Sequence, residues 1–212
     1  MGKTMDWNNK LVQIMGRCWD LMVLNLLLLV CSLPVLTTGA AVTAAYDMSL
    51  RMLRGEEGHI VRGFFRAFGS NFKQATQLWL IFLALLAVSG GDLLVRAYLP
   101  RWEALLTAAA GVQMLIVLAV ALYAFPLQAR YENTLGGILR NSAVLAVCCL
   151  PETLLMMAVS LSAVLIFLFV PLPETLLPCF ITLCLLLWFG GVIYGNAKLV
   201  RGVFQRQFHS EQ

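Results

Sequence analysis

The stretch GAAVTAAYDMSLRML, residues 39–53, decides how this chain is arranged. It is rich in alanine, it carries Asp47 and Arg51, and it is shorter than the roughly 20 apolar residues that a membrane-spanning helix needs. Whether it crosses a membrane determines on which side every later segment lies. We therefore weigh both arrangements against the distribution of charge along the chain.

The composition as a whole is that of a membrane protein. Of the 212 residues, 60% are hydrophobic and 12% are charged, and the mean hydropathy is +0.83. A soluble domain has about 45–50% apolar and about 25% charged residues. So few charges cannot cover a surface that faces water, which excludes a soluble enzyme, a nucleic-acid-binding domain and a disordered tail.

The sequence predicts six spans, at about 17–36, 38–53, 75–95, 104–127, 151–170 and 175–196. If 38–53 crosses and the N-terminus is inside, every Lys and Arg except Arg96 and Arg101 faces the cytoplasm. Five spans leave more basic residues outside. We expect an all-α polytopic bundle of six transmembrane helices, one domain over residues 1–212. It should lie in the bacterial cytoplasmic membrane with both termini cytoplasmic.

The short second span is the weak point of this arrangement. It must be buried against neighbouring helices or thin the bilayer locally. A signal-peptide pattern is also present, with Lys10 and Arg17 before an apolar run and small residues from Gly39. We do not expect cleavage there, because the following helix would lose its hairpin partner.

Three cytoplasmic interfacial helices are predicted, at about 59–73, 133–149 and 198–208. The first combines aromatic and basic positions at helical spacing and is a candidate partner or lipid interface, formed by Arg62, Phe64, Phe65, Arg66, Phe68, Phe72 and Lys73. Two interpretations stay open. The helix either anchors the protein at the lipid headgroups or docks a partner such as a permease or sensor subunit.

A candidate polar site lies in the first helical hairpin. Asp47 and Arg51 are four residues apart, so they share one helical face and can pair. Ionisable groups inside a membrane are costly and are commonly functional. The pair either ends the second span at the interface or forms a polar site with Asn25 and Tyr46.

No pattern in the chain predicts catalysis. The six cysteines lie in apolar stretches without a C-x-x-C pair, and His59 and His209 are far from them in sequence. A Walker lysine loop, an H-E-x-x-H motif and a chain of intramembrane carboxylates are also missing. We expect no enzyme, no metal site, no cofactor and no nucleic-acid partner.

Small residues recur at spacings that let helices approach closely. These residues are Gly191 with Gly195, Ala40 with Ala44, and Ala41 with Ala45. Because such pairs can also join helices of two copies of the chain, a homo-oligomer is one possible arrangement.

Several short motifs over residues 18–80 resemble the YesL family of bacterial integral membrane proteins, whose activity is not assigned. They are Leu24-Asn25-Leu26, Leu33-Pro34-Val35 with Thr38-Gly39, Ala44-Ala45-Tyr46, Leu53-Arg54-Gly55-Glu56-Glu57, Phe64-Phe65-Arg66-Ala67-Phe68, and Asn71-Phe72-Lys73-Gln74-Ala75. The resemblance implies genes that stand beside carbohydrate-uptake ABC transporters and their regulators. It provides no site residues.

Two functions follow as expectations. The first is a non-enzymatic protein that is accessory to, or regulates, a bacterial ABC-type carbohydrate uptake system. The alternative is a small-molecule transporter or channel with its polar site at Asn25, Tyr46, Asp47 and Arg51.

Overall fold

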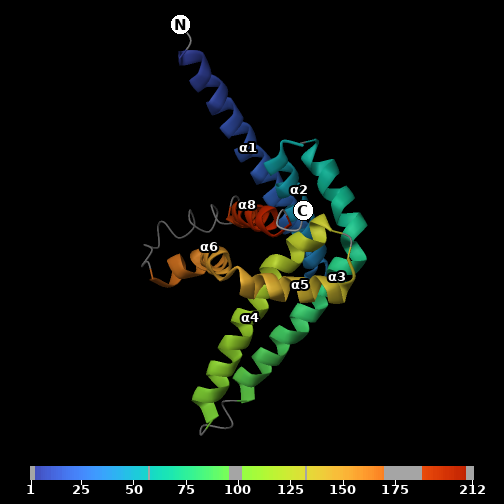
Figure 1. Cartoon of the computed structure of the whole chain (residues 1–212), viewed down its shortest axis with the longest axis vertical. Helices are drawn as coiled ribbons and strands as arrows, with labels where there is room; N and C mark the ends of the chain where they lie inside the picture. The colour runs from blue at the N-terminus through green and yellow to red at the C-terminus, as the bar shows by residue number, and fades with distance from the viewer. Residues whose placement is uncertain (1–2, 57, 96–101, 132, 170–187, 209–212) are drawn as a thin grey trace.

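The fold is known from a computed structural model, which describes residues 3–56, 58–95, 102–131, 133–169 and 188–208 (Figure 1). Its elements are helical throughout these ranges, which confirms the all-α class. They are α1 (Lys3–Ser32), η1 (Val35–Thr37), α2 (Thr38–Arg54), α3 (Ile60–Val95), α4 (Glu103–Arg130), α5 (Leu135–Cys148), α6 (Leu150–Phe169) and α8 (Phe189–Phe208).

Several helices are long and apolar enough to cross a membrane. Three such segments lie in the described residues, at Met15–Ser32, Ile60–Asp92 and Glu103–Arg130. A fourth arises if α5 and α6, which meet at an angle of 100°, count as one broken span. The structure thus provides three or four candidate spans where the sequence predicted six, and most of the predicted span 175–196 lies outside the described residues.

Helix α2 occupies the centre of the molecule. The predicted helix over 38–53 is confirmed, and it packs against α1, α3, α4 and α8. Four alanines on it, Ala40, Ala41, Ala44 and Ala45, are completely buried, because small side chains let neighbouring helices approach closely. Surrounding protein therefore covers α2, which is only 17 residues long and is not among the candidate spans.

The predicted interfacial helix 59–73 and the predicted span 75–95 are one element. The expected break between them is absent, since α3 runs without interruption for 36 residues (Figure 1). Ser70 and Asn71 do not break the helix because their side chains donate hydrogen bonds to the carbonyl oxygen of Ala67, at 3.1 and 3.0 Å. The aromatic and basic positions therefore belong to the same helix as a candidate span.

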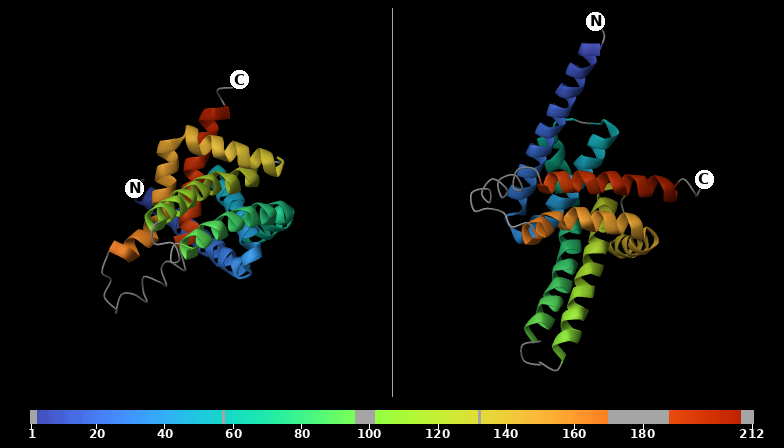
Figure 2. Two further views of the ribbon diagram at one scale, coloured as in Figure 1. Left: turned by 90° about the horizontal axis from the view of Figure 1, so that it is seen from below. Right: turned by 90° about the vertical axis from the view of Figure 1, so that its left-hand side faces the viewer.

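The same correction applies at the C-terminal end. The sequence predicted a span ending at 196 and a separate interfacial helix from 198, but α8 is continuous from Phe189 to Phe208. Figure 2 shows α8 lying across the hairpin that α3 and α4 form. Asn196 sits in the middle of this helix, buried against its neighbours, and does not end it.

The predicted helix 133–149 is confirmed as α5, and a sharp elbow joins it to α6. The hydroxyl oxygen of Thr153 lies 3.0 Å from the carbonyl oxygen of Ala146 and 2.8 Å from that of Cys149. The same hydroxyl is hydrogen bonded to the Tyr123 hydroxyl at 3.1 Å. This buried group fastens the elbow to α4.

Candidate functional site

A polar pocket opens where α2, α3 and α4 meet. Its volume is about 530 Å³, within the range of small-molecule sites. The side chains around it are almost all polar or charged. The pocket is lined by Asp47, Arg51, Arg66, Ala67, Ser70, Asn71, Gln74, Gln128, Ala129, Arg130, Tyr131 and Asn133.

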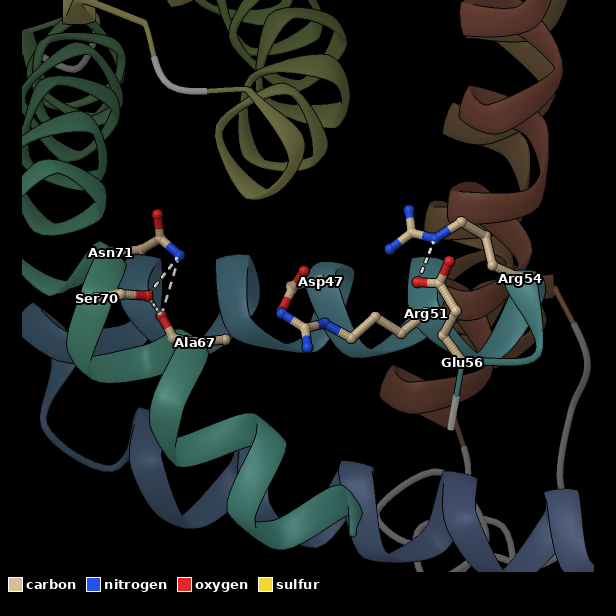
Figure 3. A network of polar contacts seen from close by, with 7 residues as sticks. All are labelled: Asp47, Arg51, Arg54, Glu56, Ala67, Ser70 and Asn71. Carbon is tan, nitrogen blue, oxygen red and sulfur yellow. Dashed lines mark hydrogen bonds and ion pairs between the residues drawn. The ribbon is translucent and has the colours of Figure 1, made fainter. Parts of the chain in front are cut away.

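Helix α2 contributes an ion pair to this pocket. Figure 3 shows the Arg51 side chain lying along the helix, with its guanidinium at the Asp47 carboxylate. The nitrogen and oxygen atoms are 2.9 Å apart. Asp47 is only 8% exposed, and its Oδ2 and the Arg51 Nε make no directed hydrogen bond. The neighbouring pair of Arg54 and Glu56 stands apart from it, at the C-terminal end of α2 (Figure 3).

Helix α3 forms the facing wall. Asn71 and Ser70 project from it, one to two turns after Arg66, and are held by the Ala67 carbonyl (Figure 3). Gln74 donates a hydrogen bond from its side-chain amide to the backbone carbonyl of Asn133, in the connection after α4. This bond ties α3 to that connection and closes one end of the pocket.

Helix α4 supplies the third wall from its last turn. Gln128 is 4% exposed, and among the residues that the structure describes neither its amide nitrogen nor its amide oxygen has a hydrogen-bond partner. Arg130 lies over the rings of Tyr131 and Phe204, with its guanidinium carbon 5.4 and 5.7 Å from their centroids. Cation–π contacts of this kind orient the guanidinium without neutralising it.

The charge around the pocket is predominantly positive. Ion pairs within the described residues involve Arg51, Arg54 and Arg206, so in that part of the chain no carboxylate pairs with Arg66 or Arg130. A second pocket of about 320 Å³ adjoins the first, sharing Arg51 and Arg66 and adding Arg62 and His59. The geometry is suited to binding a polar, anionic group.

The structure brings together only two of the four residues of the predicted polar site. Asp47 and Arg51 line the pocket, whereas Asn25 and Tyr46 do not. The side-chain oxygen of Asn25 accepts a hydrogen bond from the backbone of Gly190 at 2.9 Å, joining α1 to α8. Tyr46 is 3% exposed and belongs to the core in which the helices pack. Both residues therefore contribute to helix packing.

Sequence reasoning missed the contribution of α4. Gln128 and Arg130 lie more than 75 positions from Arg51 in the chain, and no motif links them. The one available signal was a glutamine at the end of an otherwise apolar span, beside an arginine.

The predicted partner interface on α3 is divided between core and surface. Phe64 is completely buried and stacks on the partly buried Phe68, so its assignment to an exposed interface is wrong. Phe65 and Phe72 are 51% and 40% exposed. The three basic residues, Arg62, Arg66 and Lys73, are also exposed, and Arg66 lines the polar pocket.

Metal-binding groups do not gather in the part of the chain that the structure describes. No three His, Cys, Asp or Glu side chains there lie close enough to share an ion. Among the described cysteines, Cys18, Cys31 and Cys148 are free thiols.

Comparison with known proteins adds one match. Residues 21–93 match the model of a family described as a protein of unknown function, DUF624. The DUF624 match covers the C-terminal part of α1, all of α2 and most of α3, and so two of the three pocket walls. It does not include Gln128 or Arg130. No curated protein and no solved structure matches the chain.

Proposed function

We propose that this chain is a YesL-type, non-enzymatic membrane protein that is accessory to, or regulates, a bacterial ABC-type carbohydrate uptake system. The DUF624 match supports the membership, because it covers the motifs that resemble that family. Family membership by itself does not assign a mechanism. The mechanism that we propose is docking of a permease or sensor subunit on α3.

The observation that carries this proposal is an exposed apolar stripe on α3. Val61, Phe65 and Phe72 lie on one face of the helix, each at least 40% exposed, and Arg62 and Lys73 flank them. Aromatic side chains and arginine are enriched at protein interfaces. Lipid can cover the same stripe, so the proposal needs an experiment that separates protein contacts from lipid contacts.

Photo-crosslinking in cells provides that separation. A photoreactive amino acid in place of Phe65 is expected to form a covalent adduct with a permease or sensor subunit. The control places it at Val144, an equally exposed position on α5. Adducts from Phe65 that contain only lipid, with known transporter complexes intact under the same conditions, would contradict docking.

We further infer that the protein lies in the cytoplasmic membrane with both termini inside. The concentration of basic residues before residue 74 and after residue 129 supports this orientation. A reporter enzyme fused after Gly58 should report a cytoplasmic position for this site. If the reporter instead shows that the site lies outside, the proposed orientation is reversed.

A second candidate function is transport of a small polar solute. The pocket that reaches Asp47 favours it, because a transporter needs a solvated site near its polar side chains. Under this alternative, solute flux into reconstituted vesicles should fall when Asp47 is changed to Ala. Flux that is unchanged by Asp47→Ala would remove the pocket from any transport path.

A further inference from the structure

The pocket between α2, α3 and α4 contains hydrogen-bonding groups that the protein itself leaves unused. Gln128 is the main one. A buried amide without a partner is destabilising, and here both ends of the amide are unpaired within the described residues. The Nε of Arg51 likewise has no hydrogen-bond partner in the described part of the chain, whereas the Oδ2 of Asp47 is already paired with another Arg51 nitrogen at 2.9 Å. Such groups gain stability when a ligand or ordered water supplies the missing partners.

These groups divide into donors and acceptors. The donors are the guanidinium groups of Arg66 and Arg130 and the amide nitrogen of Gln128. The acceptors are the amide oxygen of Gln128 and the Asp47 carboxylate. A simple anion would satisfy the donors only, and Asp47 would repel it. A neutral polyol would leave the charges of both arginines without a counter-charge.

We propose that this pocket binds an organic phosphate that also carries hydroxyl groups. The phosphate accepts hydrogen bonds from Arg66 and Arg130, because guanidinium groups match phosphate oxygens in charge and geometry. The hydroxyl groups donate to Asp47 and to the oxygen of Gln128. The adjoining pocket with Arg62 and His59 adds positive charge on the same side.

Two sources supply this chemistry. One is a free glycerol or sugar phosphate, and the other is the headgroup of phosphatidylglycerol, a phosphodiester with two free hydroxyls. A cavity of about 530 Å³ holds either one. Binding at this site goes beyond partner docking, since it does not involve the exposed stripe of Val61, Phe65 and Phe72.

The first arm of the test uses the full chain in phosphatidylcholine nanodiscs, titrated calorimetrically with sn-glycerol 3-phosphate, inorganic phosphate and glycerol. The second arm uses the detergent-purified chain with phosphatidylglycerol or phosphatidylcholine, and native mass spectrometry counts the retained lipids. We expect binding in at least one arm. If sn-glycerol 3-phosphate binds, the ligand is a soluble phosphate. If phosphatidylglycerol is retained selectively and sn-glycerol 3-phosphate does not bind, the ligand is a lipid headgroup.

Three variants locate the binding in the pocket. Arg66→Gln and Arg130→Gln should each weaken binding about tenfold or more, as expected for loss of a hydrogen bond to a charged group. Arg140→Gln is the matched control, because Arg140 is exposed on α5 and lines neither pocket. Gln128→Leu should weaken binding while leaving the melting temperature unchanged or higher, since it removes an unpaired buried amide.

Several results would overturn the proposal. The first is that no ligand binds in either arm. The second is that inorganic phosphate binds as tightly as sn-glycerol 3-phosphate in the first arm. The third is that Arg140→Gln and Arg66→Gln lower the binding affinity equally. A Gln128→Leu protein that is less stable but binds normally would also overturn it, because that glutamine would then have only a structural role. Crosslinking from Phe65 does not report on this pocket, so failure of docking and failure of ligand binding are separate outcomes.

Discussion

Replacing Gly39 by Ala is expected to prevent α2 from packing against α3. A Cβ atom at this position would lie 2.4 Å from the Cβ of Trp79 and 2.6 Å from the backbone oxygen of Ala75. Neither atom is the end of a flexible side chain, so one of the two helices must move. Overpacking in a core costs about 1–3 kcal/mol and occasionally more, and we expect the upper end of that range.

The surroundings of Gly39 allow little adjustment. The indole nitrogen of Trp79 donates a hydrogen bond to the carbonyl of Val35 at 2.7 Å, which fixes the ring beside the turn before α2. The Thr37 hydroxyl, in the same turn, bonds to the carbonyl of Cys31 at 2.6 Å. Moving α2 and the turn before it away from α3 would break the bond between Trp79 and Val35 as well.

Thermal melting of the detergent-purified protein measures the effect of Gly39→Ala. The matched control is Gly111→Ala in α4, where an added Cβ meets nothing within 4 Å. That control should be neutral or slightly stabilising, because alanine favours a helix over glycine by up to about 1 kcal/mol. Equal melting temperatures for the two variants would show that α2 and α3 do not approach as closely as described.

Truncating Phe64 to Ala is expected to produce the other large loss of stability. Its ring is completely buried in the core that α2 and α3 share, and it makes an edge contact with Phe65 and a stacked contact with Phe68. A buried Phe→Ala change costs about 3–5 kcal/mol in soluble protein cores. We expect a loss of that order, read as a lower melting temperature and a smaller folded fraction.

Phe65→Ala provides the control for Phe64→Ala in the adjacent position. Because half of the Phe65 side chain is exposed, its truncation should change the melting temperature little. The two changes remove the same atoms from neighbouring residues of one helix, so their difference reports burial alone. Similar losses for both variants would contradict the orientation of α3.

The sequence was sufficient to predict the helical class, the membrane setting and the positions of most helices. Residues 38–53, 104–127 and 133–149 are helices close to the predicted bounds, because hydrophobic runs, capping residues and prolines act locally. The ion pair of Asp47 and Arg51 was also predictable, since four-residue spacing places both on one helical face.

Helix continuity was decided by tertiary packing. The change from mixed to mainly apolar residues near residue 74 suggested an interfacial helix followed by a span. Composition, however, does not specify whether two such segments form one helix or two. In the structure, the N-terminal half of α3 packs through Phe64 and Ala67 into the same core as its apolar half does through Leu78 and Phe82. That shared core favours one continuous helix, and nothing between Ser70 and Ala75 interrupts it.

The residues themselves determined that this chain is a bundle of apolar helices with its positive charge gathered in a few segments, since composition and periodicity are local properties. Only the folded structure decided that α2 is enclosed by its neighbours, that Phe64 points inward, and that Gln128 and Arg130 meet Asp47 and Arg66 around one pocket. Those features depend on contacts between segments distant in the chain, which the spacing of residues along a single helix does not specify.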